Sequence, residues 1–336
     1  MKLPKSETKQ SLLSQYELAR GDVTKQTALA EKLKTSWENV QRIMPDLRRT
    51  PEPDVFREPI APTLADHIRA FKQSDTIVDF HQRVPFEWVF PIATDKPIAV
   101  CMTADWQAGQ HGVDYYSFAA DHAAWLAAER FYVNIGGDCY QNIIQSSKMG
   151  SSHNQQQISA QRGFYVTAVK PIHETGKLIA VGTGNHNYWT AMLSGEDWDM
   201  EFARHLGVAY TKHAAIIHVK VGDIDYPILR LHKGRFNSSM NLTHTCKQHQ
   251  RMDFPEARVV VVEHHHQPDI ETYYYNQKQC VAVRTGTYAV YDDFALQNGF
   301  FGSRVSNPTV VLYPHEDKIV PFLNQYDAIN YLKLES

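Results

Sequence analysis

The stretch V-V-V-V-E-H-H-H-Q, residues 259–267, constrains the fold more than any other part of the sequence. Four consecutive β-branched residues are typical of a strand that is buried on both faces. His264 and His266 follow it two positions apart, so a rigid strand end would project both imidazoles to the same side of the backbone. Imidazole is the commonest side-chain ligand for transition metals. The alternative is a polar loop rim, and the other strands of the chain decide between the two.

Four further apolar runs are predicted to be strands, and a polar cluster follows each of them. The runs are residues 98–102, 131–135, 177–181 and 228–231. The clusters are D-W-Q at 105–107, G-D at 137–138, N-H-N at 185–187 and H-K-G at 232–234. Helical stretches are predicted near 114–131 and 158–174, and strands that alternate with helices indicate an α/β body. In such folds ligands bind beyond the carboxyl ends of the strands.

The order of these clusters resembles a known family. D-x-Q-x-G, G-D, G-N-H, a single histidine after a strand and then H-x-H are similar to the motifs of the calcineurin-like metallophosphoesterase superfamily, over roughly residues 97–290. In character they resemble DNA-repair nucleases and their relatives in phage genomes. The resemblance implies a metallophosphoesterase-type β-sandwich flanked by helices, which we expect to occupy residues 63–336.

The resemblance also implies a centre of two divalent cations with a shared aspartate. The residues expected to hold the first cation are Asp105, Gln107, Asp138 and His266. The residues expected to hold the second are Asp138, Asn185, His232 and His264. His186 would not bind metal, and would act on the leaving oxygen as a general acid or stabilise transition-state charge.

Two positions depart from the family pattern. Gln107 stands where histidine is usual, and a hard amide oxygen favours Mn²⁺ or Mg²⁺ over Zn²⁺, with Fe²⁺ a further alternative. Asn187 stands where an acid is common, and an amide would stabilise a protonated His186 less than a carboxylate would. We therefore expect lower or altered activity. Three other histidines compete with His232 for the role of ligand: His213, His218 and His244.

The N-terminal residues 1–44 are predicted to form a small all-α module. Apolar periodicity over 8–20 and 24–44 indicates helices, and residues 27–43 resemble a helix-turn-helix. Ala30 would lie where two helices cross, Ser36 would cap the second helix, and Val40 would pack it down. Residues 1–50 contain ten Lys or Arg and six Asp or Glu. This basic excess fits a nucleic-acid tether, while the alternative is a helical hairpin that contacts only protein. The prolines of residues 45–62 predict a linker that begins at Pro45.

Length and composition bound the remaining expectations. The chain of 336 residues is long enough for more than one domain. Its four cysteines include no C-x-x-C pair, which indicates reduced thiols in a cytoplasmic protein, in the host cytoplasm if a phage encodes it. No apolar run approaches the length of a membrane span and the N-terminus is polar, so neither a membrane partner nor a signal peptide is expected.

The leading functional expectation is a two-metal phosphodiesterase, most specifically a nuclease acting on DNA. The N-terminal module would bind DNA, bind a protein partner or mediate self-association. Two alternatives stay open from the sequence. One is a phosphomonoesterase or small cyclic-nucleotide phosphodiesterase on the same fold. The other is a metal-binding scaffold of low activity in a nucleic-acid complex.

Overall fold

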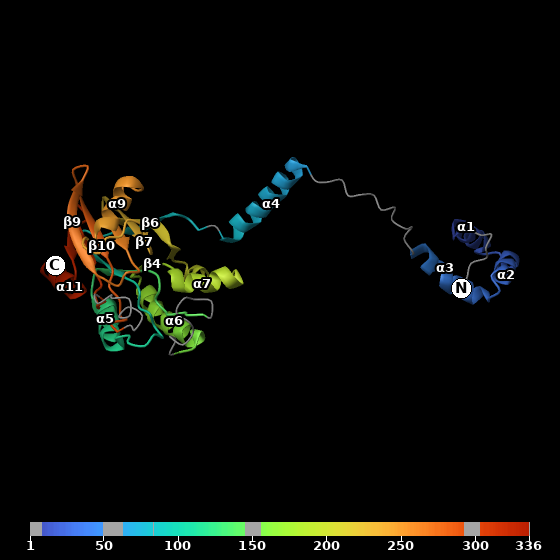
Figure 1. Cartoon of the computed structure of the whole chain (residues 1–336), viewed down its shortest axis with the longest axis horizontal. Coiled ribbons are helices and arrows are strands. Elements are labelled where there is room, and N and C mark those ends of the chain that lie inside the picture. The colour runs from blue at the N-terminus through green and yellow to red at the C-terminus, as the bar shows by residue number, and fades with distance from the viewer. Residues whose placement is uncertain (1–8, 50–62, 83, 145–155, 292–302, 336) are drawn as a thin grey trace. The chain divides into compact units, whose positions relative to one another are not determined.

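The computed structural model describes residues 9–49, 63–82, 84–144, 156–291 and 303–335. The chain divides into two compact units, Met1–Phe80 and His81–Ser336. Figure 1 shows that the first unit is helical, whereas the second combines sheets and helices. Within the described ranges, each helix is too short or too polar to cross a bilayer.

The first unit contains four helices. They are α1 (Lys9–Ala19), α2 (Val23–Lys32), α3 (Trp37–Arg49) and α4 (Leu64–Gln82). Leu12, Ala30 and Val40 belong to the buried core that α1, α2 and α3 share. Asp22 caps α2, because its carboxylate accepts hydrogen bonds from the next backbone N–H groups. Apolar side chains at helical spacing therefore account for this small three-helix core.

The turn between α2 and α3 has the features expected of a helix-turn-helix. The Ser36 hydroxyl oxygen accepts a hydrogen bond from the Asn39 N–H at 3.4 Å, as the capping prediction requires. Lys34 has a left-handed backbone with φ of 53°, at the position where glycine is usual. Trp37 is half-buried, because its ring packs against Tyr16 with 5.5 Å between centroids.

Two boundaries differ from the sequence prediction. Helix α3 continues through Pro45 to Arg49, so the linker does not begin at Pro45; proline removes one hydrogen bond of a helix without always ending it. Residues 50–62 of the expected linker lie outside the described part. The two units divide after Phe80, within α4, instead of at residue 63. Leu64 and Phe71 of α4 are exposed.

The second unit contains two six-stranded mixed sheets. The first sheet has the spatial order β1 (Glu87–Ile92), β6 (Ala214–Val221), β7 (Ile224–Leu231), β8 (Val259–Val262), β10 (Lys278–Arg284) and β9 (Asp269–Tyr275). The second sheet has the order β12 (Ile319–Phe322), β11 (Thr309–Leu312), β2 (Ile98–Thr103), β3 (Phe131–Ile135), β4 (Leu178–Val181) and β5 (Ala209–Tyr210). Strands β7 and β8 are parallel, as are β2, β3 and β4, so polar residues that follow these strands gather at shared edges.

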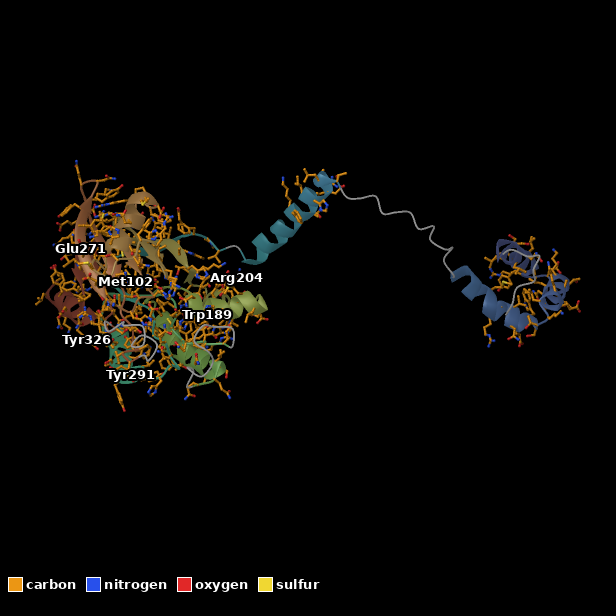
Figure 2. All side chains as sticks on the ribbon, in the orientation of Figure 1. Met102, Trp189, Arg204, Glu271, Tyr291 and Tyr326 are labelled. Atoms are coloured by element: carbon orange, nitrogen blue, oxygen red, sulfur yellow. The ribbon has the colours of Figure 1, made fainter. Side chains whose placement is uncertain are left out.

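Alternating side chains make the two sheets a sandwich. Val100 and Met102 of β2 pack against Val259 and Val261 of β8 in the core between the sheets, and Figure 2 labels Met102 inside this unit. Cys101 of β2 points to the opposite face, where helices cover it. This period of two is the geometry of a strand buried on both faces. The structure therefore has the β-sandwich flanked by helices that the sequence predicted.

Helices cover both outer faces of the sandwich. Those on the second sheet are α5 (Tyr115–Ala127), α6 (Ile158–Glu174), α8 (Trp198–Leu206) and α11 (Gln325–Leu334). Helix α9 (His244–Met252) packs on the outer face of the first sheet through Cys246, and α7 (Asn185–Ser194) follows β4. Helix α11 contributes Ala328 and Leu332 to the core on this face.

Candidate metal centre

The residues predicted to bind metal follow five different strands. Asp105 and Gln107 come after β2, Asp138 after β3, and Asn185 begins α7 after β4. In the other sheet, His232 directly follows β7, and the two remaining histidines follow β8. The carboxyl ends of parallel strands in both sheets thus supply every predicted ligand.

The residues predicted for the second cation lie together. Asp138, His232 and His264 each offer a ligand atom, and these atoms are all within 4.8 Å of one another. The Nε2 atom of His232 lies 3.1 Å from Oδ2 of Asp138 and 3.1 Å from Oδ1 of Asn185. Two carbonyl or carboxylate oxygens and two imidazoles therefore face one point.

The residues predicted for the first cation form an adjoining group. The Nε2 atom of His266 lies 3.5 Å from Oδ1 of Asp105 and 3.4 Å from the amide nitrogen of Gln107. Asp105 also connects the two groups, because its Oδ2 accepts a hydrogen bond of 2.9 Å from the backbone N–H of His264. The structure thus brings all seven predicted ligands into one neighbourhood.

Buried oxygen atoms of this group accept no hydrogen bonds, although two of them contact histidines. Asp105 Oδ1 and Gln107 Oε1 are inaccessible to solvent, and no described residue donates a hydrogen bond to either. Asp138 Oδ2 has the same status apart from its ion-pair contacts to histidine. A buried carboxylate without a partner is costly. Carboxylate, amide and imidazole groups that face one another, with oxygen atoms that accept no hydrogen bond, form a ligand set suited to divalent cations such as Mn²⁺.

Five of the seven predicted ligands have a left-handed backbone. The φ angles are 52° at Asp105, 53° at Gln107, 53° at Asp138, 75° at His264 and 59° at His266. Such conformations are uncommon outside glycine and occur most readily for Asp, Asn and His. The two histidines follow the strand, as predicted, but their left-handed backbone shows that the strand end does not extend rigidly through them. The strand ends at Val262, and a turn directs the two side chains to the site.

Glycines allow the loops after β3 and β4 to approach each other closely. A Cβ atom on Gly184 would lie 2.0 Å from Oδ1 of Asp138, and one on Gly137 would lie 2.5 Å from the backbone nitrogen of Gly184. Both distances are shorter than real side chains permit. The position of Asp138 therefore requires glycine, which has no side chain, at positions 137 and 184.

The charges of the site are strongly coupled. Burial favours a raised pKa for Asp138, but His186 and His232 outweigh it and lower the pKa well below its usual range. Burial disfavours protonation of His232, yet the adjacent Asp138 raises its pKa to about 10. Burial and the charge of His232 lower the pKa of His264 to about 2. A metal ion must therefore displace a proton from His232, so binding competes with acid.

The candidate general acid His186 lies in the first turn of α7. Its Nδ1 atom is 2.7 Å from the carbonyl oxygen of Gln141, and its Nε2 atom is 3.9 Å from Oδ2 of Asp138. The ring stacks on Trp189 with 4.5 Å between centroids, and Figure 2 labels Trp189 on the same unit. Because a carbonyl only accepts hydrogen bonds, Nδ1 carries a proton and Nε2 faces the metal centre.

The expected effect of Asn187 on His186 is not supported by the contacts. The Asn187 amide donates a hydrogen bond of 2.5 Å to Asp199 of α8 instead of facing the imidazole of His186. Consecutive residues of a helix point in different directions, so Asn187 turns away from the ring. Asp199 is fully buried and also accepts hydrogen bonds from Thr183 and Tyr140. The backbone of Gln141 orients His186 instead.

Sequence reasoning missed the residues that support the ligands from behind. Glu263 lies 3.0 Å from Nδ1 of His232 and pairs with the buried Arg230. Burial would raise the pKa of Glu263, but Arg230 and His232 lower it to about 2. Its position between the valine run and the histidine triplet was the only available signal, since a charged residue directly after a buried strand needs a partner.

The three rival histidines lie elsewhere. His213 packs edge-on against Tyr188, His218 pairs with Asp225 in the β6–β7 hairpin, and His244 begins α9. The backbone carbonyl of His213 accepts a hydrogen bond of 2.9 Å from the backbone N–H of His232, but the rings of His213 and His218 contact the partners just named. These positions favour His232 among the four histidines.

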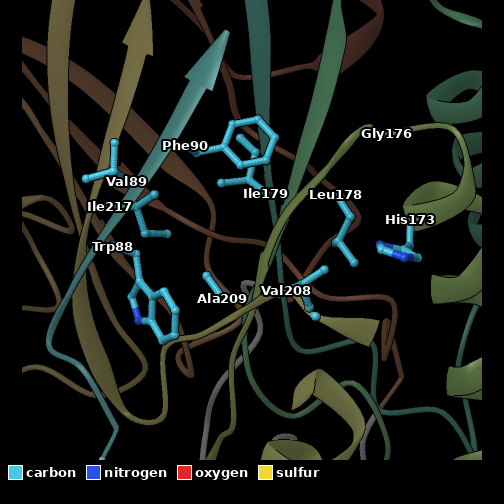
Figure 3. Close-up of a pocket in the computed structure, with 11 residues that line it drawn as sticks. Trp88, Val89, Phe90, His173, Gly176, Leu178, Ile179, Val208, Ala209 and Ile217 are labelled. Carbon is cyan, nitrogen blue, oxygen red and sulfur yellow. The ribbon is translucent and has the colours of Figure 1, made fainter. Parts of the chain in front are cut away.

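A separate apolar groove lies between the edge strands β1 and β5. It has a volume of about 620 Å³, and Figure 3 shows Trp88, Phe90, Ile179 and Val208 around it, with His173 at one end. None of its lining residues is a predicted ligand. The groove is therefore distinct from the metal centre.

The fold and the site together define a class. Two sheets flanked by helices, with candidate metal ligands after their parallel strands, form the architecture that the calcineurin-like resemblance implied. No protein-family model and no curated protein matches the chain in sequence.

Three solved structures illustrate the similarity. The calcineurin-like phosphoesterase YfkN from Bacillus subtilis is 10% identical over 71% of this chain and 100% of that chain, with a TM-score of 0.36. A 5'-nucleotidase from Staphylococcus aureus, described as putative, is 12% identical over 70% of this chain and 58% of its own, with a TM-score of 0.37. Vps29 from Entamoeba histolytica in complex with Zn²⁺ is 10% identical over 67% of this chain and 97% of its own, with a TM-score of 0.32. The chemistry proposed below is argued from the residues of this chain.

Proposed function

We propose that this chain is a metal-dependent phosphoester hydrolase, and that its substrates are phosphodiesters. The observation that carries the proposal is the convergence of Asp138, His232 and His264, with Asp105 adjoining them, around buried oxygen atoms that accept no hydrogen bond and contact only histidines. A lone buried carboxylate without a partner would be unfavourable. Two buried carboxylates beside several histidines are explained if all of these side chains bind the same cations.

The seven predicted ligands would hold two divalent cations, with Asp138 common to both. When bound, the cations would neutralise charge on the phosphoryl oxygens and provide a nucleophilic water at neutral pH. The chain offers more oxygen than nitrogen donors at the first position, which favours Mn²⁺ over Zn²⁺. Mg²⁺ and Fe²⁺ are the next candidates.

His186 would act on the leaving oxygen of the substrate. Its Nδ1 proton is held by the Gln141 carbonyl oxygen, so a second proton would be on Nε2, the atom that faces Asp138. An imidazole fixed in this way can donate a proton to a leaving alkoxide or stabilise its developing charge. Stacking on Trp189 limits the rotation of the ring.

We further propose that the natural phosphodiester is DNA, which would make the protein a nuclease. Support comes from the helix-turn-helix shape of α2 and α3 and from the basic excess of residues 1–50. Arg42 and Gln41 of α3 are exposed and available to a ligand. Basic groups on an exposed helix attract the phosphate backbone.

Two model substrates and metal replacement test this proposal. The protein, stripped with a chelator and reloaded with Mn²⁺, should hydrolyse bis-para-nitrophenyl phosphate and nick or degrade plasmid DNA. Hydrolysis of para-nitrophenyl phosphate alone would favour a phosphomonoesterase. Metal binding without turnover of any substrate would favour the scaffold alternative and would contradict the proposed activity.

A further inference from the structure

The carboxylate of Glu263 lies behind the candidate metal centre and contacts several of its parts. Its Oε2 atom is 3.0 Å from Nδ1 of His232 and accepts a hydrogen bond of 2.8 Å from the backbone N–H of Gly137. Arg230 donates to both carboxylate oxygens, at 2.6 Å from Nε and 2.5 Å from Nη2. Glu263 is 2% exposed and Arg230 is fully buried.

We propose that Glu263 is a positioning residue, which sets the orientation and the proton location of His232 so that its Nε2 atom is free to bind metal. The inference rests on the metal centre proposed above. A carboxylate can only accept hydrogen bonds, so the Nδ1 atom that faces it must carry the proton. The other ring nitrogen, Nε2, then faces Asp138 and Asn185, where a metal ion would replace its proton. A histidine ligand held by a carboxylate in this way is also a more basic ligand.

The same carboxylate controls the loop that carries Asp138. Gly137, whose N–H it accepts, directly precedes Asp138 in the sequence. A Cβ atom on Gly136 would lie 2.1 Å from Oε1 of Glu263, so the loop leaves space for this carboxylate. One side chain thus aligns ligands that come from different sheets.

Arg230 holds Glu263 in place. Its guanidinium also donates to Thr211 Oγ1 at 3.1 Å and to the Thr183 carbonyl oxygen at 3.2 Å, which are groups at the ends of β5 and β4. A planar bidentate guanidinium restricts a carboxylate to one orientation. The pair therefore fixes Glu263 relative to strand ends on both sides of the site.

The alternative is that the pair only stabilises the fold. Buried ion pairs can often be replaced by apolar residues of similar volume with little loss of stability. The double variant Arg230→Met with Glu263→Leu would then fold and bind metal normally. If Glu263 positions His232, the same variant would fold but bind metal weakly.

Metal affinity, measured by calorimetry with Mn²⁺, separates these alternatives. We expect Glu263→Gln and the double variant to bind Mn²⁺ about 10- to 100-fold more weakly than the wild type, with unchanged circular dichroism. Glu271→Gln is the matched control, because it weakens the ion pair between Glu271 of β9 and Lys247 of α9 and changes none of the predicted ligands. Affinity within about twofold of wild type in a folded variant would overturn the proposal.

Nitrogen NMR of histidine provides a readout that needs no variant. In the Zn²⁺-loaded wild type, we expect a proton on Nδ1 of His232 and metal on Nε2. An Nδ1 atom that carries no proton or that binds the metal would overturn the proposal, even if both variants fail to fold. In metal-free wild type, an Nδ1 atom without a proton would overturn it as well. Wild type that binds Mn²⁺ without hydrolysing any ester would reject the proposed function while leaving the affinity comparison valid.

Discussion

The Oδ2 atom of Asp138 lies 3.1 Å from Nε2 of His232, although one residue follows β3 and the other follows β7 of the opposite sheet. This contact joins the two halves of the sandwich at their polar edge. It places a carboxylate where ligands of both proposed cations meet. The predictions below begin with this residue.

Asp138→Asn should remove metal from both positions. The amide retains the size of the side chain but loses the charge that both cations would share. We expect metal content, measured by elemental analysis after dialysis against Mn²⁺, to fall from two equivalents towards zero. Asp225→Asn, which removes an exposed partner of His218 far from the ligands, is the control. Unchanged metal content would refute the shared role of Asp138.

Gln107→His should strengthen the first metal position. Imidazole is a softer and stronger donor than an amide oxygen, and histidine tolerates the left-handed backbone found at Gln107. We expect the weaker of the two Zn²⁺ dissociation constants to fall by about tenfold or more. Calorimetric titration with Zn²⁺ and Mn²⁺ checks this. Gln110→His in the same loop is the control, and an equal gain there would indicate a non-specific effect.

Asp199 should make stability depend on pH. Burial raises its pKa from 3.8 to about 6, although hydrogen bonds from Thr183 and Asn187 oppose the change. Because the folded state holds the proton more tightly, this stabilisation is complete below about pH 3.8 and is lost as the pH rises through about 6. The difference corresponds to about 3 kcal/mol.

Asp199→Asn has no such proton, so it provides the comparison. Relative to this variant, the wild type should gain up to about 3 kcal/mol in free energy of unfolding between about pH 7 and about pH 4. Urea denaturation of metal-free protein at several pH values measures the difference. A difference that stays constant with pH would show that Asp199 is not protonated more readily in the folded state.

Gly184→Ala should disturb the metal centre. The added Cβ would lie 2.0 Å from Oδ1 of Asp138, so the two loops must separate. We expect about tenfold weaker Mn²⁺ binding and a loss of about 1–3 kcal/mol in stability. Gly163→Ala is the opposite case, because a Cβ there meets open space on helix α6. It should stabilise the protein by about 0.5–1 kcal/mol, and similar effects of both changes would contradict the close approach.

Removal of residues 1–62 should separate DNA retention from hydrolysis. If the helices α1, α2 and α3 bind DNA, the truncated protein should bind a labelled duplex at least about tenfold more weakly at moderate salt. Its turnover of bis-para-nitrophenyl phosphate should stay within about twofold, since the ligands all lie in the second unit. Equal loss of both properties, or unchanged DNA binding, would argue against a tether.

The sequence by itself determined which residues stand at the ends of the central strands. Four valines in a row form β8, and the run before Asp138 forms β3, because short runs rich in β-branched and aromatic residues favour strands that are covered on both faces. Edge strand β9 was not foreseen, because its exposed residues such as Tyr274 weaken the apolar pattern. The burial of Ala30 and Val40 in the first unit was likewise readable from their helical spacing.

Only the tertiary structure decided which of these residues meet. Asp138 and His232 are adjacent because two sheets pack face to face, and no local pattern records that packing. The support of His232 by Glu263, the contact of His186 with the Gln141 backbone and the turn that directs His264 all depend on the same packing. Periodicity reports how each segment is buried, whereas the partners of a buried polar group are set by segments distant in sequence.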